Sequence, residues 1–579
     1  MAIIQRYSWL IILIIGLLLR TLGLNLNPIG LAHDEIHDII NSKSIALIGA
    51  GAPGTVAGRR PSPGYCDGNC VFGELGTIVL TPWMKVSPMN MLMVKIPFLI
   101  ASLLIIWLGG KLFENISGSK TIGKLTGLLI AISPWAIHFG RTAYENLFAY
   151  ALFLGSLCLW TRKKSENKEA FFGTVLGLLA SLSYFGAKAL WPPLMIVGIF
   201  YWKINSNRRW KEMVGWWLVT LLLLLGYWII LGQSIAGVRI KELKLSTDEI
   251  TTTVNNERRM SLEIPLELEK VISNKLVTKI RTLGQKYLNL LSIKYYLSDS
   301  ESSYDNFSIP GHGYVYILEI GLAVFGFVYL YQISVKGWLF LISLFLVMPI
   351  PGAINNNAVT YALRSGMIFP LISGLGAVGV YGLNKLFGRK NILYFMFGGA
   401  LIISLMYFEI LYWYRMPFEK SAGYVFYERA TVNYAFLLRK ETVNPIFWVV
   451  NEPIDIMYNY AFYTGKYQDK KWAEKMNSSI LSGNYEIDGI KISKKCPAKL
   501  DEKSIYIFER EKGCVEEPND LVRISEPRDG GARFFVTDDI LCKNENLGSY
   551  PNPRKITDFN VEKMDKSIFC KTWVSKPNK

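Results

Sequence analysis

Apolar residues in this chain come in long runs and rarely alternate with polar ones. A helix that crosses the hydrocarbon core of a bilayer needs about 20 mostly apolar residues, and about 11 runs approach that length. These runs are residues 8–24, 91–112, 122–139, 144–161, 170–186, 190–202, 213–231, 313–331, 337–350, 366–384 and 392–413. The pattern predicts a polytopic α-helical membrane protein.

Polar positions gather in two long loops and in the carboxyl-terminal tail. The loops cover about residues 25–90 and 232–312, both within a membrane domain predicted to span residues 1–413. The tail, residues 414–579, contains two short β-branched and aromatic runs, at 446–450 and 503–508, which predict strands, whereas its stretch from 467 to 476 predicts a helix. We therefore expect a small α/β or α+β domain in the tail.

An amphipathic pattern occurs within the second loop, in residues 271–297. Apolar residues recur there every three to four positions, and a polar face carries the cations Lys275, Lys279, Arg281 and Lys286. Such a helix tends to lie on a membrane surface. The alternative is a packed helix of a soluble insertion.

Composition and charge agree with a membrane protein. Of 579 residues, 51% are hydrophobic and only 19% are charged. The formal net charge of +17 reflects lysine and arginine in alternate short loops and in the tail, without a basic stripe interleaved with aromatics, so it does not indicate nucleic-acid binding. Cytoplasmic loops are the ones enriched in these cations. The sequence thus predicts an integral plasma (inner) membrane protein with a cytoplasmic amino terminus, and with both long loops and the tail on the extracytoplasmic side.

Cysteine positions agree with that orientation. Six of the seven cysteines fall in segments predicted to lie outside, and Cys158 falls within a span. The six are Cys66, Cys70, Cys496, Cys514, Cys542 and Cys570. An even number in an oxidising compartment indicates disulfides, and proximity favours a pair between Cys66 and Cys70 over a zinc site; the pairing of the other four stays open.

The densest acidic cluster directly follows the first span. Residues 31–38 read LAHDEIHD, with three acids and two histidines in eight positions. Solvated loop charges are the ordinary explanation. The acids Asp34 and Glu35 are also candidates for general-base chemistry. The flanking His33 and His37 additionally suggest a metal site.

A few charged residues stand at the predicted outer ends of later spans. They are Arg141, Glu145, Lys188 and Arg364, and prolines and aromatics such as Tyr361 surround them. If these ends converge, acids and cations share one cavity at the lipid boundary. A carboxylate could then take a hydroxyl proton while fixed cations stabilise a lipid-borne phosphate.

Several short stretches, in this order and at these places in the topology, resemble one known family. They are Asp34-Glu35; Asn90 with Val94-Lys95-Ile96-Pro97; Ser133-Pro134-Trp135; Phe139 through Glu145; Tyr184 through Lys188 with Pro192; Pro310-Gly311-His312-Gly313; and Leu363-Arg364 through Pro370. The chain resembles the GT-C glycosyltransferases of the protein O-mannosyltransferase type and the related aminoarabinose-lipid A transferases.

That resemblance implies a GT-C fold and a glycosyl transfer with inversion on the outer side. The donor would be a polyprenyl-phosphate-linked sugar, and the acceptor a hydroxyl on a protein, lipid or glycan. Asp34 resembles the family's general base and Glu35 its partner, with the reverse assignment left open. Arg141 and Glu145 resemble the pair that shapes the site, and Arg364 an arginine suited to the donor phosphate.

Some residues depart from the family pattern. Lys95 and Lys188 stand where arginine is common, and lysine lacks the bidentate fork that arginine offers a phosphate. His312 either binds donor or acceptor, or is a tolerated imidazole in a turn before a helix. No cofactor beyond the lipid-linked donor is required by these residues, and use of a divalent metal stays open.

Three other functions compete with this prediction. A transporter would place ionisable residues near the bilayer midplane, often in repeated halves, and neither feature is evident here. An oligosaccharyltransferase would carry a Trp-Trp-Asp motif in its tail, which this chain lacks. A ligase or polymerase that moves a whole glycan remains the alternative within the same fold.

Overall fold

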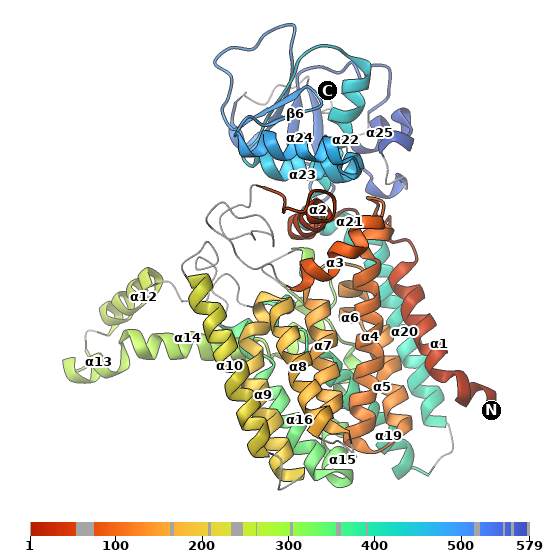
Figure 1. The fold of residues 1–579 in the computed structure, drawn as a ribbon, viewed down its shortest axis with the longest axis vertical. Coiled ribbons are helices and arrows are strands. Elements are labelled where there is room, and N and C mark those ends of the chain that lie inside the picture. Colours follow the sequence, from red (N-terminus) through yellow and green to blue (C-terminus); the bar gives the residue numbers. More distant parts are fainter. Residues whose placement is uncertain are drawn as a thin grey trace. The chain divides into compact units, whose positions relative to one another are not determined.

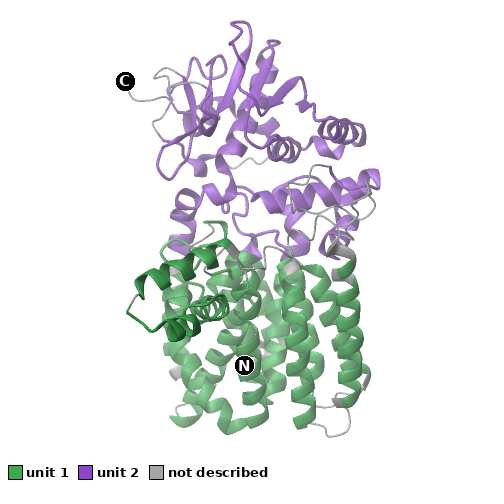
Figure 2. Cartoon of the chain, turned by 90° about the vertical axis from the view of Figure 1, so that its left-hand side faces the viewer, with its two compact units in different colours: residues 1–19, 100–139, 145–406 green, residues 20–99, 140–144, 407–579 purple. Residues whose placement is uncertain are grey.

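The fold was obtained as a computed structural model of the chain. It describes residues 2–53, 75–162, 167–205, 210–232, 247–261, 263–301, 305–354, 360–388, 392–514, 521–547, 550–556 and 561–575. The predicted pair Cys66 and Cys70 lies outside these residues. The chain divides into two compact units (Figure 2). Unit 1 comprises residues 1–19, 100–139 and 145–406, and unit 2 comprises residues 20–99, 140–144 and 407–579.

Unit 1 is a bundle of helices (Figure 1). Each of the 11 predicted apolar runs contains a helix of the structure. Apart from those of the second long loop, the helices that lie wholly or partly in unit 1 are α1 (Ala2–Thr21), α4 (Met91–Ser117), α5 (Lys120–Ile132), α6 (Pro134–Gly140), α7 (Asn146–Thr161), α8 (Asn167–Ser183), α9 (Phe185–Asn205), α10 (Trp210–Gly232), α15 (Ile317–Ile333), α16 (Val335–Val347), α17 (Ile350–Ala353), α18 (Ala362–Ser365), α19 (Ile368–Leu386) and α20 (Ile392–Tyr414).

Length and hydropathy identify candidate membrane spans among the described residues. Three helices qualify, at Met91–Ser117, Val335–Ala353 and Tyr394–Tyr414. The predicted span 122–139 is instead two helices, α5 and α6, bent by 60°. Pro134 explains the break, because a proline is tolerated at the first position of a helix and not in its interior. Shorter apolar helices occur at Tyr7–Thr21, Asn146–Thr161 and Ile317–Ile333, so the number of spans stays a prediction.

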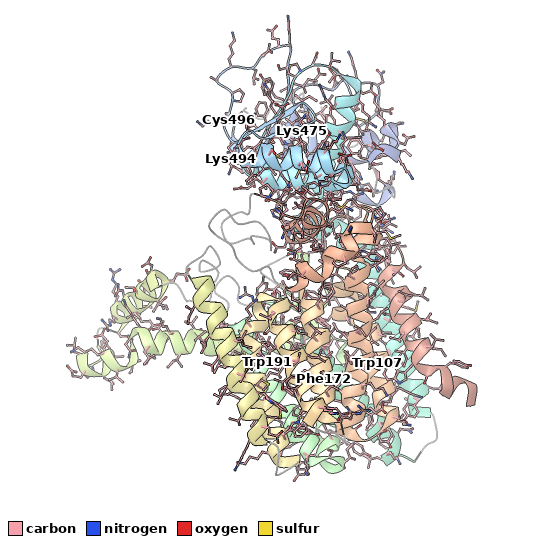
Figure 3. The ribbon with its side chains drawn as sticks, in the orientation of Figure 1. Trp107, Phe172, Trp191, Lys475, Lys494 and Cys496 are labelled. Atoms are coloured by element: carbon pink, nitrogen blue, oxygen red, sulfur yellow. A yellow bond between two sulfur atoms is a disulfide. The ribbon has the colours of Figure 1, made fainter. Side chains whose placement is uncertain are left out.

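Small residues and aromatic rings fill the interior of unit 1. A side chain at Gly326 of α15 would collide with the backbone of α19 at Leu375, so this glycine lets the two helices approach closely. Trp191 of α9 stacks on Trp160 of α7, with ring centroids 5.9 Å apart, and Figure 3 shows it among the helices. Both indoles are almost fully buried.

The second long loop forms helices α12 (Thr247–Met260), α13 (Leu266–Ile272) and α14 (Lys275–Asn289) to the side of the bundle (Figure 1). The side chain of Asn274 caps α14 by accepting from the N–H groups of Leu276 and Val277. Leu276 and Ile280 are exposed along this helix, so the predicted amphipathic helix is present with an uncovered apolar face. Its placement on a membrane surface stays a prediction.

Unit 2 holds a mixed six-stranded sheet with the order β2-β3-β1-β4-β6-β5. Its strands are β1 (Ile446–Val449), β2 (Glu486–Ile487), β3 (Ile490–Ser493), β4 (Ile505–Glu509), β5 (Val522–Ser525) and β6 (Ala532–Val536). Strand β1 runs parallel to β3 and β4, and the other pairs are antiparallel. The predicted strands at 446–450 and 503–508 are therefore confirmed as β1 and β4.

Helices of unit 2 come from the tail and from the first long loop. The tail forms α21 (Met416–Glu419), α22 (Phe426–Glu441), α23 (Pro453–Tyr463), α24 (Lys470–Leu481) and α25 (Lys566–Trp573), and the loop forms α2 (His33–Ile48) and α3 (Leu75–Val86). The helix predicted at 467–476 corresponds to α24 and a short 3-10 turn before it. Helix α2 packs against α23 and α24 (Figure 1).

Two disulfides tie the tail together. Cys496 pairs with Cys514, and Cys542 pairs with Cys570, which resolves the pairing that the sequence left open. Figure 3 shows Cys496 in this domain. Cys158 in α7 is a free thiol. The Cys496–Cys514 bond joins the segment after β3 to the one after β4, and Cys514 packs beside Tyr506 and Phe508.

Candidate active site

The two adjacent acids after the first span have different surroundings. Glu35 is fully buried, and its carboxylate accepts from the N–H of Ala32, at 2.8 Å, and from the N–H of Ala143. Burial raises the pKa of Glu35, against the opposing effects of Lys95 and the two N–H groups. Asp34, in the first turn of α2, is exposed. Glu35 therefore anchors α2 to residue 143, while Asp34 is open to solvent.

Lys95 and Arg141 complete this anchor. Lys95 Nζ donates to the carbonyl oxygen of Arg141 at 2.7 Å. The Arg141 guanidinium donates to the carbonyl oxygens of Asn27, at 2.6 and 3.0 Å, and Leu22, at 2.9 Å, and it lies 5.0 Å from the centroid of the Trp413 ring. Both cations are almost completely buried. The Arg141 side chain thus binds backbone carbonyl groups of the segment before α2.

His33 and His37 bind carboxylates of the tail. His33 Nε2 lies 2.9 Å from Glu428 Oε1, and its Nδ1 lies 3.1 Å from Asp455 Oδ2. His37 Nε2 lies 2.8 Å from Asp455 Oδ1. The described residues contain no group of three His, Cys, Asp or Glu side chains arranged to hold a metal ion. In this structure the two histidines contact carboxylates of α22 and α23.

Charge explains the protonation of this cluster. Burial disfavours a charged His33, but Glu428 and Asp455 outweigh it and raise the pKa of His33 well above its usual value. Burial likewise opposes the charged form of Asp455, yet hydrogen bonds from His33 and His37 hold its pKa far below the usual range. Both shifts favour the charged forms of His33 and Asp455.

Arg364 is the centre of a second polar region, in unit 1. Its guanidinium lies 4.9 Å from the centroid of the Tyr361 ring, and the Tyr184 hydroxyl is hydrogen-bonded to it. Gly186 leaves room for it, since a Cβ there would come within 2.9 Å of Arg364 Cγ. Aromatic faces of this kind favour a guanidinium. The arginine is thus held in place by two tyrosines.

The backbone that carries Arg364 is fixed by two buried side chains. Glu301 accepts from Thr360 Oγ1 at 2.8 Å and from the N–H of Ala362 at 2.9 Å. The Tyr150 hydroxyl donates to the carbonyl oxygen of Leu363 at 2.8 Å and accepts from the N–H of Gly366 at 3.1 Å. Helix α18 is therefore held at both ends.

The other predicted residues of unit 1 are also placed. Glu145, at the start of α7, is buried and acts electrostatically on Tyr184, so it belongs to the Arg364 region. Lys188 is buried in the first turn of α9. His312 lies in a turn, with Nδ1 2.7 Å from the carbonyl oxygen of Gly313, and burial lowers its pKa. The choice between the two predicted roles of His312 stays a prediction.

Sequence reasoning missed the residues that support these charges. Glu301, Glu428 and Asp455 have no recognisable motif around them. The only local signal is that Asp455 falls two residues after a proline, in the first turn of a helix, where an acid is common for capping reasons. Their partners become apparent only from the fold.

Comparisons with known proteins give structural similarity alone. No protein-family model matches the chain, and no curated protein matches it. Similar solved structures include the archaeal oligosaccharyltransferase AglB from Archaeoglobus fulgidus in complex with an inhibitory peptide and a dolichol-phosphate (TM-score 0.45, 11% identity, 88% of this chain and 70% of that one). ArnT from Cupriavidus metallidurans is similar in its apo state (TM-score 0.45, 10% identity, 92% of this chain and 98% of that one) and bound to undecaprenyl phosphate (TM-score 0.45, 11% identity, the same coverage).

Proposed function

We propose that this chain is a membrane glycosyltransferase of the GT-C type. It would move a sugar from a polyprenyl-phosphate donor to a hydroxyl of a protein, lipid or glycan acceptor. The observation that carries the proposal is the pair Asp34 and Glu35. The carboxylate of Glu35 is bound to two backbone N–H groups, and Asp34 beside it is exposed on a helix that this binding immobilises.

The chemistry assigns one role to each acid. Asp34 takes the proton of the acceptor hydroxyl as its oxygen forms a bond to the anomeric carbon. The bond from that carbon to the donor phosphate breaks, and the phosphate leaves with the electron pair, so the configuration inverts. Glu35 keeps α2 in place through its two N–H groups and is fully buried, whereas the exposed Asp34 can meet the acceptor hydroxyl. This favours Asp34 over the reversed assignment.

Arg364 is the cation proposed for the donor phosphate. A guanidinium stabilises the charge that the phosphate gains on leaving, and an arginine fixed between tyrosines needs little reorganisation to do so. Lys188 and Glu145 are proposed to line this region. Arg141 and Lys95 have a different proposed role, because their polar groups hold backbone carbonyls before and beside α2.

The proposed orientation places α2 and the tail on the extracytoplasmic side of an inner membrane. The disulfides Cys496–Cys514 and Cys542–Cys570 support it, since such bonds persist in oxidising compartments. Hexoses, mannose among them, are the sugars we propose first.

The test is sugar transfer by the purified full chain in lipid nanodiscs. Radiolabelled undecaprenyl- and dolichyl-phosphate hexoses serve as donors, with wild type beside Asp34→Asn and a chelator in a parallel sample. Glu474→Gln, at an exposed acid of α24, is the matched control. We expect release by wild type and by the control, and none by Asp34→Asn. Absence of release from every donor in folded protein would favour a whole-glycan ligase or a transporter.

A further inference from the structure

The carboxyl-terminal domain contacts α2 on the side of its histidines. His33 and His37 are four residues apart, so they lie on one face of the helix, one turn from each other. Asp455 of α23 uses one carboxylate oxygen for each of them, at 3.1 and 2.8 Å. The Asp455 side chain thus contacts α2 at two positions that are one turn apart.

Glu428 of α22 adds a third contact. Its Oε1 binds the second nitrogen of His33 at 2.9 Å, and its Oε2 accepts from Asn459 Nδ2 at 2.7 Å. Both ring nitrogens of His33 are therefore used, which fixes the plane of the imidazole. Asp455 and Glu428 are both buried, so their charges are poorly screened. We name the four side chains His33, His37, Glu428 and Asp455 the histidine clamp.

The clamp has a direct geometric consequence for Asp34. In an α-helix successive residues are rotated by a fixed angle, with 3.6 residues per turn. When His33 and His37 are held at one face, the direction in which the Asp34 side chain projects from the helix axis is also set. No contact with Asp34 itself is needed for this effect.

Further contacts attach the same segment at other points along the chain. The Tyr463 hydroxyl accepts from the N–H of Leu31 at 3.1 Å, and Asn477 Nδ2 donates to Ser44 Oγ at 3.2 Å. Tyr458 donates to the carbonyl oxygen of Pro53. These bonds lie before the first turn of α2, late in α2 and after it, whereas the clamp and the bond between Glu35 and the N–H of Ala143 lie in the turn that carries Asp34.

We propose that Asp455 and Glu428 are positioning residues for Asp34 and act through His33 and His37. The carboxyl-terminal domain is then required for the transfer step itself, in addition to any contact with the acceptor. This inference rests on the proposed function, because it assigns a role to the domain in the same reaction. A misplacement of about 1 Å can cost about 100-fold in rate.

The test compares Asp455→Asn with Asp488→Asn in the full chain in nanodiscs. Asp488 is a matched control, since its carboxylate accepts from Tyr460, Lys466 and Trp472 of the same domain and from no residue of α2. We expect Asp455→Asn to lower kcat about 10- to 100-fold with an unchanged KM for the donor, and to speed hydrogen exchange in the first turns of α2. Asp488→Asn should do neither. Asp455→Glu, which keeps the charge, should recover part of kcat.

The outcomes separate this inference from the proposed function. Hydrogen exchange is read without substrate, so unchanged exchange in α2 of Asp455→Asn overturns the clamp even if no donor is turned over. Normal kcat in Asp455→Asn overturns the positioning role while the transferase stands. If Asp455→Asn does not fold, His33→Gln gives the same two readings, because it removes both contacts of His33 and keeps the pair of Asp455 with His37.

Discussion

The two charged regions of this protein differ in how far their central side chain is exposed. In unit 2, Asp34 is exposed and its neighbours are bound: Glu35 to backbone N–H groups and His33 to two carboxylates. In unit 1, Arg364 is itself enclosed, with Tyr361 and Tyr184 around the guanidinium and the backbone on either side held by Glu301 and Tyr150.

The difference agrees with what each charge has to do in the proposed reaction. A base has to exchange a proton with an incoming hydroxyl, so it gains from exposure while its carrier stays rigid. A cation that stabilises a leaving phosphate gains from a fixed position and from reduced contact with water. Substitutions in the two regions should therefore affect different kinetic constants.

The largest effect is expected from Asp34→Asn. Removal of a general base costs about 100- to 10,000-fold in rate, and the amide keeps the size of the side chain. The donor should bind with unchanged affinity, because Asp34 has no proposed contact with the phosphate. Single-turnover transfer and equilibrium binding of the labelled donor measure the two quantities. If Asp34→Asn protein transfers sugar at the wild-type rate, the general base is another group.

Arg364→Ala should lower the affinity for the donor, which Asp34→Asn should leave unchanged. Loss of a hydrogen bond to a charged group costs about 1.5–3 kcal/mol, so we expect donor affinity to fall about 10- to 100-fold. Arg364→Lys is the matched variant, since lysine keeps the charge and loses the planar fork, and its affinity should lie between the two. Donor binding that is equal in all three proteins would remove Arg364 from the phosphate role.

The helices and the exposed acid could be predicted from the sequence, since both depend on local patterns. A long apolar run allows few structures other than a helix, and each predicted run contains one. The break at Ser133-Pro134 was visible as a proline, but whether a proline kinks a span or begins a new helix depends on its neighbours. Helix α2 is missing from the elements that the sequence predicts, although Ile36, Ile39 and Ile40 recur there at helical spacing between acids and histidines.

The supports of the site could not be predicted, because they are distant in sequence. His33 meets Glu428 across 395 positions, and His37 meets Asp455 across 418. The same motif His-Asp-Glu-x-His suits a metal site or an ion-pair cluster, and only the acids that fold against it decide between these. Arg141 illustrates the same limit: an arginine beside a span can bind a phosphate or a carbonyl, and here it binds carbonyls.

Glu35→Gln should act on stability more than on chemistry. A glutamine side chain has one acceptor oxygen, so one of the N–H groups of Ala32 and Ala143 is left without its partner, at a cost of about 1–3 kcal/mol. We expect a lower midpoint of thermal unfolding and faster hydrogen exchange at residue 143, with kcat of the folded protein reduced less than in Asp34→Asn. A kcat loss equal to that of Asp34→Asn, without a change in stability, would restore the reversed assignment of the two acids.

The smallest effect is expected from pH, through the histidine clamp. His33 has a raised pKa in the folded protein, so its ion pairs contribute stability that is complete below the ordinary value of 6.5 and is lost as pH rises through the raised pKa. Asp455 has a depressed pKa, so its contribution is present above 3.8 and is lost only as pH falls below it. Each unit by which a pKa is shifted is worth about 1.4 kcal/mol. The groups that face His33 are Glu428 of α22 and Asp455 of α23, and Asp34 is adjacent on α2.

The midpoint of unfolding of wild type should exceed that of His33→Gln at pH 6, and the difference should shrink as the pH is raised. A difference that grows with pH would show that His33 is held neutral, and that its contacts are ordinary hydrogen bonds.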